Sequence, residues 1–279
     1  MLRDDDQRRL GGGAGGAPVS TDLQVPSQRR FFIAPERLAR SPVELPDDIA
    51  RQVRHVLRLG AGDRIELLDG HGRAYVARLL DGRAGRAELV APLPDDEVEP
   101  RLHIMVALAL LRGERFEWAL QKCTELGAVG FIPLIARRTV VQAGDAAAKL
   151  ARWQRIVREA AEQSRRRILP HVFPITPLAR LCSVPYDTDG LYPPLRIALW
   201  EGERERSLSH VLHAVFTSTA SPTDVLLVVG PEGGFDPSEL EGLRAWGALT
   251  AGLGRRVLRA ETAAVLGTAL TLALAGELG

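Results

Sequence analysis

The chain has 279 residues, of which 46% are hydrophobic, and it carries a formal net charge of +1 at pH 7. This length and composition allow a sizeable buried core in one or two domains, and we favour two. The sequence lacks a window of about 20 apolar residues that could span a bilayer. Its charged, then glycine-rich start lacks the apolar stretch of a signal peptide. We therefore expect a soluble, cytoplasmic protein with no membrane partner.

The two cysteines, Cys123 and Cys182, are far apart in the sequence and have no CxxC spacing or neighbouring histidines. Neither a disulfide framework nor a zinc site is indicated by this pattern. We predict two reduced packing residues and no metal centre.

The small net charge hides two basic segments. Residues 29–58 hold seven arginines against four carboxylates, and residues 137–167 hold eight arginines and one lysine against three. Arginine suits phosphate contacts and base stacking better than lysine does. A GC-rich genome that replaces lysine by arginine would explain the residue type but not the clustering.

Residues 1–28 are rich in Asp, Arg, Gly and Ser without periodicity, which predicts a disordered tail. Short strand-like runs separated by Asp-Gly turn pairs follow and predict a small β-barrel or meander. Within it, residues 46–60 have apolar side chains at helical spacing and predict one short helix, with three arginines and His55 along its exposed side.

The proline-rich, acidic stretch 92–100 separates two sequence patterns, so we predict domains over residues 29–97 and 98–279. Beyond it, apolar strand-like runs alternate with helical patterns, which is typical of an open α/β sheet. The predicted strands are 102–110, 130–135, 170–175, 195–200 and 224–230, and the predicted helices are 114–126, 145–168, 236–247 and 261–279.

The predicted helix 145–168 has an apolar stripe that includes Trp153 and Val157, with its arginines largely off that stripe. A solvated helix face is one interpretation. Because Arg137 and Arg138 precede this helix, the pattern favours a surface for polyanions.

Two glycine-bearing loops near the carboxyl end have the form of ligand loops. The run "VVGPEGGF" (228–235) takes an apolar strand into a Pro and glycines just before a helix, where backbone amides can approach a ligand. It lacks the GxGxxG spacing of dinucleotide sites, and no GxxxxGK[ST] motif occurs in the chain. A plain type II turn is the alternative interpretation.

The run "LTAGLGRRVLRAETAAV" (249–265) has the same form, with a bend at Gly254, a basic loop and an acidic residue, Glu261, in the first helical turn. The helix that follows is apolar on nearly every side, so it must be covered. We predict that a second copy of the chain covers it in a homodimer, a deeply enclosed loop being the alternative.

These motifs carry a resemblance. "GPEGGF" and "LGRRVLRAETA", with "HVLRLGAGDRIELLDGHG", "LQKCTELG", "FIPLIARRTV" and "EAAEQSRR" upstream, make residues 29–277 similar to the bacterial small-subunit ribosomal RNA uridine-N3 methyltransferases, the RsmE family of the SPOUT superfamily. The chain departs from the family pattern at Arg112, where lysine is common, and in its glycine-rich tail.

The resemblance implies a PUA-like N-terminal β-barrel, a C-terminal trefoil-knotted SPOUT α/β domain, S-adenosylmethionine as cofactor, and a homodimer with active sites at the subunit interface. Both glycine-bearing loops would enclose the cofactor. The implied cofactor-binding residues are Leu199, Gly230, Pro231, Glu232, Gly233, Gly234, Leu253, Gly254, Val257, Leu258, Arg259, Thr262 and Ala263.

Methylation of uracil N3 requires loss of the imide proton, so the site needs a base or a cation that stabilises the resulting anion. Arg259 or another loop arginine could supply the cation. Glu232 or Glu261 could accept the proton, although Glu232 could instead organise the ligand loop and Glu261 could instead stabilise the helix start.

The implied partner is 16S ribosomal RNA or the small ribosomal subunit, with the target uridine flipped into the pocket. The candidate RNA-binding residues are Arg30, Arg54, His55, Arg58, Arg137, Arg138, Arg165 and Arg166. Two alternatives stay open: a SPOUT methyltransferase that acts on another RNA, and a non-catalytic RNA-binding assembly factor.

Overall fold

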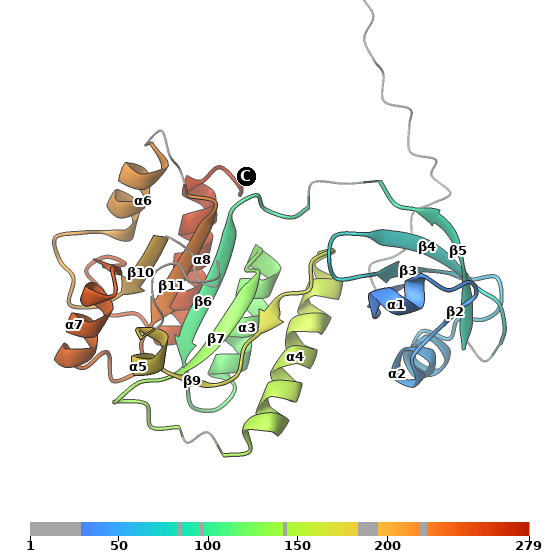
Figure 1. Ribbon diagram of the computed structural model, residues 1–279, viewed down its shortest axis with the longest axis horizontal. Helices are drawn as coiled ribbons and strands as arrows, with labels where there is room; N and C mark the ends of the chain where they lie inside the picture. The colour runs from blue at the N-terminus through green and yellow to red at the C-terminus, as the bar shows by residue number, and fades with distance from the viewer. Residues whose placement is uncertain are drawn as a thin grey trace, which may run out of the picture.

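The computed structural model describes residues 29–82, 85–94, 98–141, 144–183, 195–217 and 222–278. Two groups of elements are visible in Figure 1: a small curled sheet near the N-terminus, and a larger α/β sheet with helices on both faces. The fold class expected from the sequence is confirmed. The tail predicted over residues 1–28 lies outside the described residues.

The N-terminal sheet has the strand order β1–β3–β4–β5–β2, in which β1 runs parallel to β3 and the other pairs are antiparallel. Val53 and Ile49 pack from the short helices onto its apolar face beside Phe31 and Ile65. The strands are β1 (Arg30–Phe32), β2 (Val43–Glu44), β3 (Arg64–Leu68), β4 (Ala74–Leu79) and β5 (Arg86–Pro92).

The helix predicted over residues 46–60 is present but shorter and irregular. It begins as α2 (Asp47–Arg51) after Pro46, continues as the π-helical turn η3 (Gln52–Val56), and ends before Arg58, whose φ of 54° is left-handed. A four-residue helix, α1 (Pro35–Leu38), precedes it.

The C-terminal sheet has the order β12–β10–β11–β6–β7–β8, and all its pairs are parallel, with β9 also pairing with β7. The sequences of its central strands are continuous apolar runs, because helices cover both faces of the sheet. The strands are β6 (His103–Ala109), β7 (Gly130–Ile135), β8 (His171–Val172), β9 (Thr176–Pro177), β10 (Leu195–Leu199), β11 (Asp224–Val229) and β12 (Leu249–Ala251).

Helices α3 (Arg115–Leu126), α4 (Ala146–Gln163), α6 (Leu208–Phe216) and α8 (Ala260–Leu274) share one apolar cluster with the sheet. Helices α5 (Leu178–Leu181) and α7 (Pro237–Ala245) contribute to the cluster on the other face. The strand predicted over 170–175 is present only as the two-residue β8, and β9 begins just after the predicted range. The predicted helix 236–247 begins as expected, with Asp236 as N-cap in a capping box and Pro237 next.

After β12 at the sheet edge, the chain returns to the middle of the sheet, where α8 packs on β11 and β6. On its way it passes close to the loop after β10: the Gly252 amide donates to the Arg206 carbonyl, and the Leu208 amide donates to the Gly252 carbonyl. A Cβ at Gly252 would overlap the Glu203 carbonyl, so this close passage requires glycine.

The long helix α4 ends at Gln163 and not at Ile168 as predicted. Arg165 has a left-handed φ of 64°, and the chain then turns so that the amides of Arg167 and Ile168 donate to the Glu99 carboxylate. A distant carboxylate therefore satisfies the backbone donors that would otherwise have continued the helix.

The two sheets meet at a joint between β1 and the end of α4. The Arg30 guanidinium pairs with Glu66 and donates to the carbonyls of Arg165 and Arg166. The Phe32 amide donates to the Glu162 carboxylate, and the Arg158 guanidinium donates to the Phe32 carbonyl. Polar side chains thus fix the small sheet against α4.

Candidate active site

One pocket of about 370 Å³ lies at the carboxyl ends of β10 and β11, under the loop between β12 and α8. This is the position at which open α/β sheets bind ligands. The lining residues are Arg115, Leu199, Trp200, Glu201, Val229, Gly230, Pro231, Glu232, Gly234, Leu253, Gly254, Arg256, Val257, Leu258, Arg259, Ala260 and Ala263.

The structure brings the two glycine-bearing loops together at this pocket. It places eleven of the thirteen predicted cofactor-binding residues in the lining, although their role in binding stays a prediction. Gly233 and Thr262 do not line the pocket. A Cβ at Gly233 would face the side chain of Arg138, and Thr262 is exposed on α8.

The sequence did not single out Arg115, Trp200, Glu201 or Arg256 as site residues. Trp200 and Glu201 follow β10 directly, so the rule that ligands bind beyond parallel strands could have found them. Arg115 opens α3, and it could be assigned only once β6 was known to lie next to β11.

The loop after β11 is a tight turn against two neighbours. Gly234 has a left-handed φ of 68°, and its amide donates to the Pro231 carbonyl. A Cβ at Gly234 would overlap the Glu201 carboxylate, whereas Gly230 lies against the ring of Phe235. The carboxylate of Glu201 therefore approaches this loop only because residue 234 is glycine.

Asp236 anchors the loop to α7. Hydrogen bonds from Ser238, helped by the nearby guanidinium groups of Arg137 and Arg138, hold the pKa of the Asp236 carboxyl below its usual range. The Arg138 guanidinium also donates to the Gly233 carbonyl at 3.0 Å. Two of the predicted RNA-binding arginines therefore lie directly beside the loop that lines the pocket.

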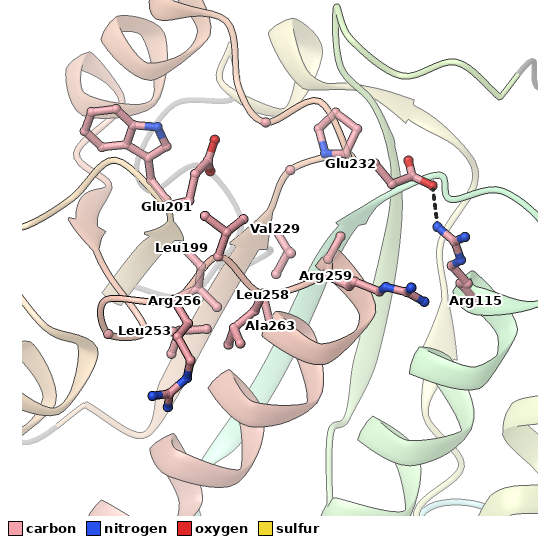
Figure 2. A pocket seen from close by; sticks show the side chains of 17 residues that line it. Arg115, Leu199, Glu201, Val229, Glu232, Leu253, Arg256, Leu258, Arg259 and Ala263 are labelled. Carbon is pink, nitrogen blue, oxygen red and sulfur yellow. Dashed lines mark hydrogen bonds and ion pairs between the residues drawn. The ribbon is translucent and has the colours of Figure 1, made fainter.

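Arg115 connects the two carboxylates that were candidates for the base. Its Nη1 lies 3.4 Å from Glu232 Oε1 (Figure 2), and its Nε lies 3.9 Å from Glu261 Oε1. Glu232 Oε1 also accepts from the Arg112 amide at 3.2 Å. Glu261 is 7% exposed, and its Oε2 has no hydrogen-bond partner among the described residues.

The predicted RNA-binding residues divide into two groups. Arg54, His55, Arg58, Arg137, Arg138 and Arg165 are exposed. Arg30 and Arg166 instead have buried side chains, 5% and 2% exposed, which make their contacts inside the protein. Arg30 pairs with Glu66, and Arg166 pairs with Glu99 and donates to the carbonyls of Thr124 and Ala128.

Among the described residues, no group of three or more His, Cys, Asp or Glu side chains could hold a metal ion. Within the same residues, no helix has the length and hydropathy needed to cross a membrane.

Comparison with known proteins gives the class. The profile of the RNA methyltransferase domain family matches residues 98–272, and the profile of the RNA methyltransferase PUA domain matches residues 45–91. A parallel sheet with a pocket at its carboxyl edge, beside a small curled sheet, is thus the architecture of an RNA methyltransferase.

Individual relatives narrow this class. The ribosomal RNA small subunit methyltransferase E of Synechocystis is 36% identical over 88% of this chain and 77% of its own length, and that of Bacillus subtilis is 32% identical over 84% and 92%. The chain belongs to the ribosomal RNA small subunit methyltransferase E family, as the resemblance indicated.

Solved structures agree with this assignment. The Neisseria gonorrhoeae ribosomal RNA small subunit methyltransferase E, bound to S-adenosyl methionine, is 30% identical with a TM-score of 0.75, over 88% of this chain and 97% of its own. A putative methyltransferase from Legionella pneumophila, in complex with the same cofactor, is 27% identical with a TM-score of 0.74 over the same shares.

Proposed function

We propose that the protein transfers a methyl group from S-adenosylmethionine to N3 of a uridine in 16S ribosomal RNA of the small ribosomal subunit. That it is an S-adenosylmethionine-dependent RNA methyltransferase follows from its family and from neighbours solved with this cofactor. The observation that carries the proposal is the single pocket formed by the two glycine-bearing loops.

The pocket fits the cofactor by size and chemistry. A cavity of about 370 Å³ lies within the usual range of small-molecule sites. Leu199, Val229, Leu253 and Leu258 offer apolar contacts to an adenine ring, and the glycines that line the pocket let a ligand approach the loop backbone closely. The carboxylate of Glu201 can accept from ribose hydroxyls. When bound, the cofactor supplies an electrophilic methyl group on a sulfonium.

The basic end of the pocket suits the target base. Arg115 and Arg259 both line it, and in Figure 2 the Arg259 side chain extends toward the end where Arg115 and Glu232 meet. An imide that loses its proton gains negative charge, which cations in a partly enclosed site stabilise. We assign Arg259 to this end of the pocket and keep two acidic residues there: Glu232, which lines the pocket, and Glu261, which lies outside the lining beside Arg115.

We infer that RNA binds across the exposed basic residues on both sheets. Arg54, His55 and Arg58 lie on the α2–η3 segment, and Arg137 and Arg138 lie beside the pocket. Phosphate contacts of this kind make the affinity dependent on salt. The bacterial cytoplasm, where ribosomal subunits assemble, is the corresponding place of action.

We also propose a homodimer. Three apolar side chains near the pocket and α8 are exposed: Val257 at 75%, Trp118 at 44% and Leu274 at 41%. Val257 lines the pocket, so a partner that covers it would also enclose the cofactor. Sedimentation equilibrium of the purified protein tests this, and a monomer at micromolar concentration would contradict it.

The experiment on function uses labelled S-adenosylmethionine with three substrates: naked 16S ribosomal RNA, 30S particles and transfer RNA. Label in 16S RNA that nuclease digestion assigns to 3-methyluridine is the expected result. Label in another RNA or at another atom would replace the proposed substrate. Binding of RNA without any label transfer would favour the non-catalytic assembly factor.

A further inference from the structure

Arg115 occupies a position in the pocket that no motif singled out. It opens α3, two buried leucines and a short turn beyond the carboxyl end of β6, and 43% of its side chain is exposed to the pocket and solvent. Its two ion-pair partners come from different elements, Glu232 from the loop after β11 and Glu261 from the first turn of α8. Folding of the whole C-terminal sheet therefore assembles this group.

The two contacts orient the guanidinium without using all its donors. Nη1 faces Glu232 at 3.4 Å and Nε faces Glu261 at 3.9 Å, which leaves the remaining donors of the planar fork for a ligand. Glu261 is buried, and one of its oxygens has no partner among the described residues. A buried carboxylate with spare acceptor capacity holds a nearby cation in place.

Arg259 is anchored differently. It is the N-cap residue of α8 and is exposed, and among the described residues no hydrogen bond or ion pair fixes its guanidinium. A charge that stabilises a transition state is effective when it is already oriented before the reaction. Of the arginines at this end of the pocket, Arg115 meets this condition better than Arg259.

We propose that Arg115 is the catalytic cation that donates a hydrogen bond to a carbonyl oxygen of the target uracil, and that Glu261 is the positioning residue that orients it. This inference rests on the proposed function. In the step that it describes, the N3 proton leaves to solvent and the negative charge spreads over N3 and its flanking oxygens, one of which faces Arg115. N3 then bonds to the methyl carbon as the donor's carbon–sulfur bond breaks, and that electron pair stays on sulfur.

The same geometry assigns a supporting role to Glu232. Its Oε1 is shared by the Arg112 amide and the Arg115 guanidinium, so this oxygen already accepts from two donors. The charged side chains that face Arg115 are Glu232 and Glu261, with Arg259 extending toward the same end of the pocket. Glu201 lies at the other end.

The test compares single-turnover methylation rates of wild type, Arg115→Ala and Arg115→Lys across pH. The substrate is unmethylated 30S particles whose RNA contains either uridine or 5-fluorouridine, whose N3 is more acidic. We expect Arg115→Ala to lower the rate on uridine RNA by about 10²–10³ at neutral pH and to move the rising limb of its pH profile to higher pH. The loss should be smaller on 5-fluorouridine RNA, and Arg115→Lys should restore part of the rate.

A second readout does not depend on turnover. Fluorine NMR of the 5-fluorouridine RNA, with S-adenosylhomocysteine bound, reports ionisation of the target base. We expect its pKa in the complex to be higher with Arg115→Ala than with wild type, and also higher with Glu261→Gln. Arg101→Ala, which removes an exposed arginine just before the amino end of β6 and so away from the pocket at the carboxyl ends of the strands, should change neither readout.

Calorimetry with S-adenosylmethionine separates this role from a structural one, because Arg115→Ala should bind the cofactor with an affinity close to that of wild type. An equal loss of rate on both RNAs, or an unmoved pH profile and base pKa, would overturn the inference while leaving the proposed function intact. Failure of the wild-type protein to methylate either RNA would overturn both.

Discussion

At the scale of single residues, the neighbouring residues Gly233 and Gly234 in the loop after β11 have different structural roles. Gly234 has a left-handed backbone and leaves room for the Glu201 carboxylate inside the pocket. Gly233 has no such constraint on its backbone, and its missing Cβ faces Arg138 outside the pocket. The motif "GPEGGF" shows both as identical letters, so only the structure tells which one the ligand site requires.

We predict that Gly234→Ala weakens binding of S-adenosylmethionine at least tenfold. A non-glycine residue in this conformation costs the loop roughly 1–2 kcal/mol, and the new methyl group would also displace the Glu201 carboxylate from its place in the pocket. Isothermal titration calorimetry measures the change. Gly233→Ala is the matched control and should change the affinity by less than about threefold. Equal losses in the two variants would contradict the assignment.

Burial of single arginines could not be predicted from the sequence. Arg30 and Arg166 stand beside Arg29 and Arg165 in basic runs, and an arginine is exposed by default. Their burial depends on Glu66 and Glu99, which lie 36 and 67 residues away in the chain. The pattern identified a basic surface, and distant carboxylates decided which of its members face inward.

At the scale of elements, the end of α4 separates a surface arginine from an internal one. The left-handed residue Arg165 reverses the chain, so that the Arg165 side chain is exposed while that of Arg166 enters the protein. Arg166 then joins the end of α4 to Glu99, before β6, and to the carbonyls of Thr124 and Ala128 at the end of α3. One side chain thus holds three segments together.

We predict that loss of Arg166 affects stability, whereas loss of its neighbour Arg165 affects RNA binding. Arg166→Ala should lower the free energy of unfolding by about 3–5 kcal/mol, because it leaves the Glu99 carboxylate without its cation and removes a donor from the carbonyls of Thr124 and Ala128. Arg165→Ala should change stability by less than about 0.5 kcal/mol but should weaken RNA binding and reduce its salt dependence. Urea unfolding and filter binding at several salt concentrations measure these effects. A stable Arg166→Ala protein with weak RNA binding would restore the original surface assignment.

Helices and strands with clear periodicity were predicted well, because the spacing of apolar residues within each segment determines its buried face. The strands 102–110, 130–135 and 224–230 correspond to β6, β7 and β11, and Asp236 is the N-cap that the sequence indicated. Deviations arose where tertiary contacts override local preference. The early end of α4 is of this kind, because the Glu99 carboxylate takes the amides of Arg167 and Ile168.

At the scale of the whole molecule, the order of strands was beyond sequence reasoning. Apolar runs show that strands are covered by helices, but they do not show that β6 lies between β11 and β7, or that β12 lies at the edge beyond β10. This order brings the two glycine-bearing loops and Arg115 to one pocket. The sequence predicted the loops by their glycines, whereas Arg115 depended on the order and was missed.

The joint between the sheets contains a carboxyl group whose ionisation should affect stability. Burial raises the pKa of the Glu162 carboxyl from its usual 4.5 to about 7, despite the lowering effects of the Phe32 amide and of Arg158, while Glu159 and Asp48 add to the rise. The pKa of Glu162 is higher in the folded protein than in the unfolded chain. Its contribution to the free energy of unfolding is therefore complete below pH 4.5 and is lost as pH rises through 7.

Glu162→Gln keeps an acceptor for the Phe32 amide and cannot ionise. We predict that, relative to wild type, this variant gains roughly 1–3 kcal/mol in the free energy of unfolding between pH 5 and pH 8. Urea unfolding at both pH values measures the difference. Glu159→Gln, an exposed neighbour on α4, is the control and should leave the pH dependence nearly unchanged. If Glu162→Gln showed the same pH dependence as wild type, the carboxylate at the joint would already be charged in the folded protein, and the small sheet would be held against α4 by an ion pair with Arg158 instead of a neutral hydrogen-bonded contact.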